Sequence, residues 1–179
     1  MNIIILLGPP GVGKLTVANE LTKLRKIALF DNHQVIDMVE PIVTREYKGF
    51  GRLVYDTQLK VIEAAAEYGE QDIVFTFAFS IDETAGIELL RSIEKIGENY
   101  SARIHLIYLS CDQAELERRV LELSRHHTHG KIKDMESLRK LADQYDLKTP
   151  PQGENVTIID TTTVSAQETA KQIEKVIYS

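Results

Sequence analysis

The chain begins Met1-Asn-Ile-Ile-Ile-Leu-Leu-Gly-Pro-Pro-Gly-Val-Gly-Lys-Leu-Thr16. Residues 3–7 are a continuous apolar run, which is typical of a strand that a parallel sheet buries on both faces. The stretch from Gly8 matches the pattern G-x-x-x-x-G-K, which forms a phosphate-binding loop when it lies between such a strand and a helix. Val17, Leu21 and Leu24 then share one helical face. The opening therefore predicts a strand, a glycine-rich loop and a helix over residues 14–25.

The composition of the loop suits a polyphosphate ligand. Glycines at positions 8, 11 and 13 can adopt backbone angles that a Cβ disfavours, so that successive N–H groups can point at phosphate oxygens. The helix N-terminus adds partial positive charge, and Lys14 adds a full charge for the β- and γ-phosphates. The alternative is a glycine-rich turn without a ligand. We expect ATP to contact Gly8, Pro9, Pro10, Gly11, Val12, Gly13, Lys14, Leu15 and Thr16.

The residue after the lysine departs from the usual loop. A Ser or Thr there commonly ligates Mg²⁺, but this chain has Leu15, and Thr16 is placed to reach the α-phosphate. Magnesium is therefore expected to be held mainly by phosphates, waters and carboxylates. Asp82, at the end of a predicted strand, is a possible carboxylate ligand, although it more simply caps the helix expected over residues 82–96.

The rest of the chain alternates short apolar runs with longer amphipathic segments, which indicates βαβ units and a mostly parallel sheet. Further strands are expected at residues 27–30, 72–79, 103–109 and 156–160. Helices are expected at 33–47 (interrupted by Pro41), 52–68 and 135–144, with Asp112 and Ser165 as N-caps of two more. The sequence predicts a single α/β domain over residues 1–179, a three-layer α/β/α sandwich whose ligands bind at the carboxyl ends of the strands.

Composition excludes several classes of function. The net charge of −6 argues against binding to nucleic acid through its phosphates. Residues 3–7 are too few to span a bilayer, and one cysteine fits a reducing compartment, so we expect a cytoplasmic protein without membrane contact. The guanine-reading motif N-K-x-D is absent, which argues against a GTPase. A monomer and a homodimer are both compatible with the sequence.

The phosphate-binding loop resembles that of adenylate kinase and related nucleoside monophosphate kinases, which also lack the hydroxyl after the lysine. The order of elements resembles the shikimate kinase and adenylate kinase group over essentially the full chain. The stretch Phe30-Asp-Asn-His-Gln-Val-Ile-Asp37 is similar to an acceptor-contacting segment of shikimate kinases. The resemblance implies the P-loop NTPase fold of the nucleoside monophosphate kinase type, with a five-stranded parallel sheet.

The resemblance also implies roles on the acceptor side, within an acceptor-binding segment of about residues 32–70. Asp31 matches an acidic residue of the family and is expected to orient or deprotonate the acceptor hydroxyl. It also suits a helix N-cap. His33 replaces a second aspartate, and is either an acceptor contact or a solvated residue at a helix start. Arg52 falls near the arginine that such kinases use to hold an anionic acceptor.

The stretch Leu116-Glu-Arg-Arg-Val120, followed by Arg125, resembles the helix that leads into the lid of these kinases. Arg125 is the expected phosphate ligand there, and residues 125–133 are the expected lid. Arg119 is expected to contact the nucleotide, or only to pair with Glu115 or Glu122 on its own helix. Thr161 follows the last strand and is expected to pass the adenine. The lid histidines suggest a metal site, but a positive lid is the simpler interpretation.

One departure bears on the acceptor. Shikimate kinases have a triple-glycine loop after the third strand, whereas this chain has Phe79-Ser-Ile-Asp-Glu83, which argues against shikimate itself. The sequence is thus similar to shikimate-kinase-like proteins of unassigned substrate. It predicts an ATP-dependent phosphotransferase that uses Mg²⁺ and acts on a small hydroxylated or phosphorylated metabolite. The alternatives are a nucleotide-binding regulator and an NTPase that transfers phosphate only to water.

Overall fold

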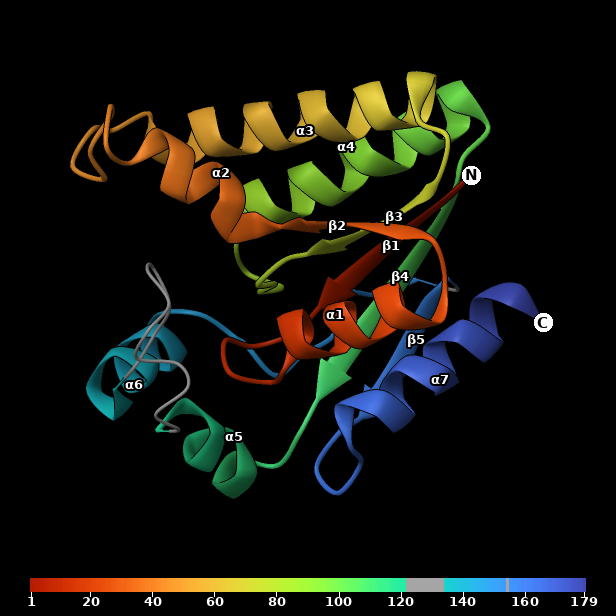
Figure 1. Ribbon diagram of the computed structural model, residues 1–179. Coiled ribbons are helices and arrows are strands. Elements are labelled where there is room, and N and C mark those ends of the chain that lie inside the picture. Colours follow the sequence, from red (N-terminus) through yellow and green to blue (C-terminus); the bar gives the residue numbers. More distant parts are fainter. Residues whose placement is uncertain (122–133, 154) are drawn as a thin grey trace.

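The computed structural model describes residues 1–121, 134–153 and 155–179 (Figure 1). Within these ranges the chain forms five strands and seven helices. The strands are β1 (Asn2–Leu7), β2 (Ile27–Asp31), β3 (Asp72–Thr76), β4 (Arg103–Ser110) and β5 (Val156–Asp160). They lie in the order β2-β3-β1-β4-β5, and all neighbouring pairs are parallel. The predicted five-stranded parallel sheet is confirmed.

Strand β1 occupies the centre of the sheet. It pairs with β3 on one side, where Ile3 lies beside Ile73, and with β4 on the other, where Ile3 lies beside Ile104. Helices cover both faces, so residues 3–7 are completely buried. A strand in this position has no face that meets water, which is why its apolar run is continuous rather than alternating.

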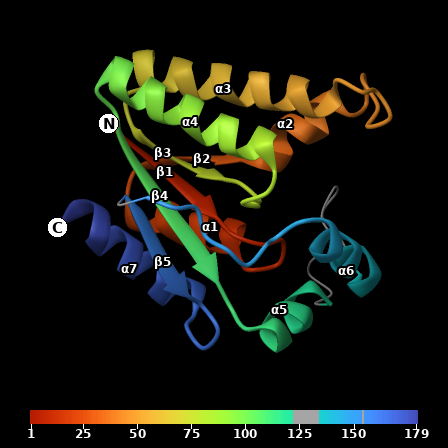
Figure 2. The same ribbon diagram turned by 180° about the vertical axis from the view of Figure 1, so that it is seen from behind.

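Four helices form the outer layers of the sandwich (Figures 1 and 2). Helices α1 (Lys14–Leu24) and α7 (Ala166–Tyr178) pack together on one face of the sheet, and α3 (Phe50–Tyr68) and α4 (Thr84–Tyr100) pack together on the other. Each face has its own buried cluster of aliphatic and aromatic side chains. Among the described residues, no helix has the length and apolar character that crossing a bilayer requires.

Three shorter helices lie near the carboxyl ends of the strands (Figure 1). They are α2 (Asn32–Val39), α5 (Gln113–Val120) and α6 (Met135–Gln144). The predicted N-caps are confirmed for α5, where the Asp112 side chain accepts the N–H of Glu115 at 2.7 Å, and for α7, where Ser165 accepts the N–H of Glu168 at 3.1 Å. The predicted lid, residues 125–133, lies outside the described residues.

Two predicted elements are shorter in the structure. The helix expected over residues 33–47 ends at Val39, and turns follow, because Pro41 cannot donate to a continuing helix. The strand expected over residues 72–79 ends at Thr76. Its neighbour β2 ends at Asp31, directly opposite Thr76, and the chain there enters α2. Beyond Thr76 the strand therefore loses a partner, and Phe77 and Phe79 fill the core instead.

The Asp72 carboxylate joins both ends of the chain at the amino edge of the sheet. It accepts hydrogen bonds from the backbone N–H of Asn2 at 2.6 Å, from Asn2 Nδ2 at 2.9 Å, and from the hydroxyl of Tyr178. Partial burial raises the pKa of Asp72, but these hydrogen bonds outweigh that effect and hold the pKa below its usual value. One side chain thus links β1, β3 and α7.

Two helical glycines have contrasting surroundings and provide a test of the packing. A Cβ at Gly97 in α4 would lie 2.6 Å from Cγ1 of Ile104, whereas a Cβ at Gly51 in α3 would meet nothing within 4 Å. We expect Gly97→Ala to lower the free energy of unfolding by about 1–3 kcal/mol, because it overpacks the contact between α4 and β4. Gly51→Ala is the matched control and should raise it by up to about 1 kcal/mol through helix propensity. Chemical denaturation measures both values, and equal changes would contradict the tight contact at Gly97.

Candidate functional site

The glycine-rich loop joins the carboxyl end of β1 to the start of α1. Gly8, Gly11 and Gly13 have φ values of 135°, 97° and 107°, as the sequence predicts for residues that need backbone angles unfavourable to a Cβ. At Gly8 the space is restricted as well, because a Cβ would lie 2.3 Å from the carbonyl oxygen of Leu109 in β4. The loop is therefore held against the neighbouring strand at its first residue.

The N-terminus of α1 is suited to an anion. Its N-cap is Gly13, which has no side chain to accept the first N–H groups, and no acidic residue occupies the first turn. Lys14 Nζ donates to the carbonyl oxygens of Gly8 at 2.7 Å and Pro9 at 2.8 Å, so its charge stays at the loop. Thr16, in the first turn of the helix, is exposed. Helix N–H groups and a lysine together attract phosphate oxygens.

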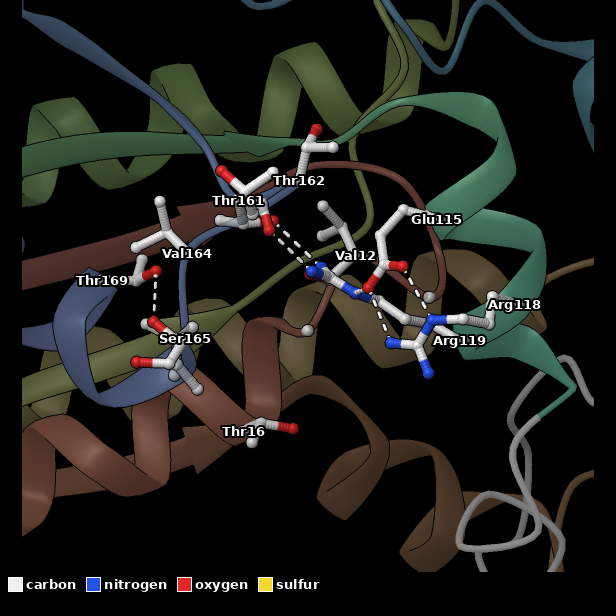
Figure 3. A pocket seen from close by; sticks show the side chains of 15 residues that line it. Val12, Thr16, Glu115, Arg118, Arg119, Thr161, Thr162, Val164, Ser165 and Thr169 are labelled. Carbon is white, nitrogen blue, oxygen red and sulfur yellow. Dashed lines mark hydrogen bonds and ion pairs between the residues drawn. The ribbon is translucent and has the colours of Figure 1, made fainter.

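A first cavity, of about 520 Å³, opens beside this loop on the side of β4 and β5 (Figure 3). Its walls come from the loop, from α5, and from the segment between β5 and α7. The cavity brings together several residues predicted to bind nucleotide, which are Gly11, Val12, Gly13, Thr16, Arg119 and Thr161. Thr162, Thr163 and Ser165 add further hydroxyl groups. We call it the loop cavity.

Arg119 connects the two walls of the loop cavity. Its Nη1 donates to the Val12 carbonyl oxygen at 2.8 Å and to Thr161 Oγ1 at 3.0 Å, and its Nη2 donates to the Thr161 carbonyl oxygen at 2.6 Å. Its Nε also pairs with Glu115 at 2.6 Å, so the predicted ion pair is present, but it is not the only interaction of this residue. Figure 3 shows the guanidinium lying between these partners. Arg119 therefore holds the phosphate-binding loop and the segment after β5 in a fixed relation.

Glu115 is the anionic counterpart in this wall. It accepts hydrogen bonds from both Arg118 and Arg119, and these two guanidinium groups lower its pKa to about 2. Glu115 therefore stays ionised at any pH at which the protein is expected to work. The charge of Arg119 is balanced within the cavity wall before any ligand enters.

Asp31 is the N-cap of α2, as the alternative interpretation of this residue predicts. Its side chain accepts the backbone N–H of Gln34, while Gln34 Oε1 accepts the backbone N–H of Asp31 at 2.9 Å. The hydroxyl of Thr76, at the end of β3, also donates to Asp31 Oδ1. His33 Nδ1 lies 3.7 Å from Asp31 Oδ2. The carboxylate is thus fixed at the carboxyl edge of the sheet beside an imidazole.

Sequence reasoning missed two amides behind this carboxylate. Gln58 of α3 is completely buried, and its Nε2 donates to Asn32 Oδ1, while its own Oε1 is buried without a hydrogen-bond partner. Gln58 interrupts the otherwise apolar buried stripe of α3, which runs through Phe50, Val54 and Ile62. A polar residue in an apolar stripe was the available signal, because a buried amide is costly unless it is hydrogen-bonded.

A second cavity, of about 770 Å³, lies on the side of β2 and β3. It is bounded by α2, α3, the segment after β3, α4 as far as Lys95 and one residue of α6, and we call it the α3–α4 cavity. Arg52 lines it, but its side chain is 73% exposed and pairs with Asp56 at 2.8 Å. Asn32 lines it next to Asp31. Of the predicted acceptor-side residues, Arg52 lines this cavity, whereas Asp31 and His33 are not among its lining residues.

Asp82 does not have the capping role expected for it, and its predicted Mg²⁺ contact stays a prediction. The N-cap of α4 is Glu83 and not Asp82, and the Glu83 side chain makes no capping hydrogen bond. The Asp82 carboxylate accepts the hydroxyl of Ser80 and the backbone N–H of Asp146 at 3.1 Å, and these hydrogen bonds lower its pKa. The predicted cap is wrong because the loop after α6 supplies a donor from far along the chain.

Two further predictions concern the phosphate contact of Arg125 and the ligands of Mg²⁺. Arg125 lies outside the described residues, so its predicted phosphate contact is untested. Within the described ranges, no group of three or more histidine, cysteine, aspartate or glutamate side chains could hold a metal ion. The predicted Mg²⁺ ion, held mainly by phosphates, waters and carboxylates, stays a prediction.

No known protein-family profile matches the chain, and no curated protein sequence matches it. Solved structures do match it along nearly its whole length. Shikimate kinase from Acinetobacter baumannii, solved with shikimate, has a TM-score of 0.61 at 19% identity, covering 99% of this chain and 93% of that one. APS kinase from Mycobacterium tuberculosis, solved with AMPPNP and APS, has a TM-score of 0.62 at 14% identity, covering 99% and 98%.

A gluconokinase from Sinorhizobium meliloti also matches, with a TM-score of 0.55 at 13% identity, covering 99% of this chain and 95% of that one. These three proteins act on different acceptors, and each is less than one quarter identical to this chain. A likeness at this level is a likeness of fold, and it agrees with the resemblance seen in the sequence. The chain has the fold of the P-loop small-molecule kinases.

Proposed function

We propose that the protein is an ATP-dependent phosphotransferase that moves the γ-phosphoryl group of ATP to a small hydroxylated or phosphorylated metabolite. The observation that carries the proposal is that the glycine-rich loop follows the central strand β1, and the sheet has one cavity on each side of that strand. The loop cavity lies on the β4 and β5 side, and the α3–α4 cavity lies on the β2 and β3 side. A loop so placed suits binding ATP on one side and an acceptor on the other.

On the nucleotide side, the proposal rests on the uncapped N-terminus of α1 and on Lys14. The N–H groups of the loop would bind the phosphates, and Lys14 would exchange its two carbonyl partners for the β- and γ-phosphates. The adenine would lie against the segment that begins at Thr161. Arg119 would bind at the nucleotide while keeping both walls of the loop cavity in place.

On the acceptor side, we propose that Asp31 accepts the proton of the acceptor hydroxyl as its oxygen attacks the γ-phosphorus and ADP leaves. Three hydrogen bonds to or from Asp31 fix its position, which supports a role in orientation. His33 and Arg52 would contact the acceptor. Arg125, proposed from the sequence alone, would neutralise charge on the transferred phosphoryl group, and residues 125–133 would form the lid.

Mg²⁺ would bind mainly to the triphosphate and to water, because Leu15 offers no oxygen ligand and the Asp82 carboxylate already accepts hydrogen bonds from Ser80 and Asp146. Its chemistry there would be to neutralise charge on the β- and γ-phosphates.

Replacing Lys14 tests the nucleotide side. We expect Lys14→Met to weaken binding of the ATP analogue AMPPNP by about 10- to 100-fold, because it removes a charge-assisted contact to phosphate. Lys23→Met is the matched control, since Lys23 lies on the same helix, is 65% exposed and pairs only with Glu20 among the contacts described. Titration calorimetry measures both affinities. Equal affinities for the two variants and the wild type would show that the loop does not bind the phosphates.

Acceptor dependence separates the phosphotransferase from the two alternatives. A coupled ADP-release screen with nucleosides, sugars, shikimate-like acids and aminoglycoside-type alcohols should show one class that stimulates turnover above the rate with water. ADP release at the same rate with every compound would indicate an NTPase. AMPPNP binding without any turnover would indicate a nucleotide-binding regulator.

Replacing Asp31 tests the acceptor side. Asparagine caps helices as well as aspartate does, so Asp31→Asn should keep α2 in place while removing the base. We expect transfer to the best acceptor of the screen to slow by about 10²- to 10⁴-fold, with AMPPNP affinity nearly unchanged. Asp112→Asn, at the N-cap of α5, is the control for capping alone. A loss of nucleotide affinity as large as the loss of turnover would assign Asp31 a structural role.

A further inference from the structure

The lining of the α3–α4 cavity separates charged from apolar side chains by depth. Seven charged side chains line it, and six of them are exposed at the rim, while the seventh, Glu83, is partly buried. The six are Arg45, Arg52, Asp56, Glu88, Arg91 and Lys95. Rim charges of both signs are solvated and partly paired, as with Arg45 on Glu40 and Arg52 on Asp56. They therefore contribute little to binding at depth.

The deeper wall of the cavity is apolar and aromatic. Phe50, Val54, Phe77 and Leu89 are buried, with exposed fractions of 9%, 3%, 2% and 2%. The ring of Tyr55 packs edge-on against that of Phe77, with centroids 5.8 Å apart and an interplanar angle of 68°. Such walls favour a flat ring that can add to the aromatic contacts.

Asn32, which follows Asp31 in the chain, and Glu83 are partly buried polar residues of the lining, and no buried cation is among the described lining residues. Asn32 presents its Nδ2 as the remaining donor, because its Oδ1 accepts from Gln58. Glu83 accepts the hydroxyl of Tyr55 at 3.1 Å. One amide donor and one carboxylate acceptor suit the hydroxyl groups of an alcohol, whereas a small organic acid would meet the negative charge of Glu83.

The size of the cavity also favours an acceptor that is larger than a bare sugar. At about 770 Å³ it is larger than the loop cavity, and it falls within the range of pockets that enclose drug-sized ligands. A bare sugar or a sugar acid would leave most of the apolar wall uncovered. An acceptor that carries a ring system as well as hydroxyl groups would cover both parts.

We propose that the acceptor is an amphipathic alcohol, in which a hydroxylated part faces Asp31 and Asn32 and a flat apolar ring system lies against Tyr55, Phe77 and Leu89. This inference rests on the proposed function, because it names the acceptor class of the same site. It distinguishes the protein from kinases of small sugar acids, whose acceptors carry no apolar ring.

Matched pairs of probes test this preference directly. One pair is phenyl and methyl β-D-glucopyranoside, and the other is adenosine and ribose. The members of a pair have similar sugar hydroxyl groups, and only the first member carries an aromatic ring. We expect at least one of the two aromatic probes to bind about 10- to 100-fold more tightly than its non-aromatic partner, as burial of an aromatic ring predicts. Titration calorimetry of the full chain saturated with AMPPNP measures the affinities. D-gluconate and shikimate should bind no better than the non-aromatic member of each pair.

A pair of variants locates the binding. Ala85 is exposed in the first turn of α4 and lines the cavity, so Ala85→Trp should obstruct part of it and abolish the preference for the aromatic probe. Ala64 is equally exposed on α3 but lines neither cavity, so Ala64→Trp should leave the preference unchanged. Thermal unfolding checks that both variants fold.

The outcomes separate this inference from the proposed function. The acceptor class is overturned if neither aromatic probe binds better than its partner, or if the preference survives Ala85→Trp. Neither result would change the conclusion from AMPPNP binding. A ring preference that Ala85→Trp removes, without acceptor-stimulated ADP release, would support the cavity's selectivity and count against phosphoryl transfer.

Discussion

The close approach of Gly8 to the carbonyl oxygen of Leu109 is the constraint from which the site follows. Any Cβ at this residue would lie 2.3 Å from that oxygen, so only glycine lets the chain leave β1 directly beside β4. The turn begins there with a φ of 135°, and it directs the N-terminus of α1 toward the carboxyl edge of the sheet. The uncapped N–H groups of α1, the position of Lys14 and the contact of Arg119 with Val12 all depend on this turn.

Local chemistry made much of the fold predictable from the sequence. Several features depend only on residues close to one another in the chain, and the structure has each of them. They are the buried run at residues 3–7, the glycine-rich loop, and the N-caps Asp112 and Ser165. The failures depend on distant contacts. Asp82 does not cap α4 because Asp146, far along the chain, donates to it. The apolar stripe of α3 could have indicated Gln58 itself, but its partner Asn32 comes from another helix, and no local pattern indicates that pairing.

The strand order explains why the proposed donor and acceptor sites lie on opposite sides of one loop. Because β1 lies between β3 and β4, the loop after β1 has the ends of β2 and β3 on one side and those of β4 and β5 on the other. Asp31 and Thr76 occupy the first side, and Arg119 and Thr161 the second. The sequence indicated Asp31, Arg119 and Thr161 but not Thr76, and the order of strands is a tertiary property that the alternation of elements left undetermined.

The Asp72 carboxylate has a practical consequence for work with this protein. It holds Asn2 and Tyr178 at the amino edge of the sheet, and both chain ends therefore lie on the side opposite the glycine-rich loop (Figure 1). A fluorophore, an affinity tag or a surface linkage attached at either end would stand away from both cavities. Immobilised protein could thus be examined by surface plasmon resonance or single-molecule fluorescence with its loop edge facing the solution.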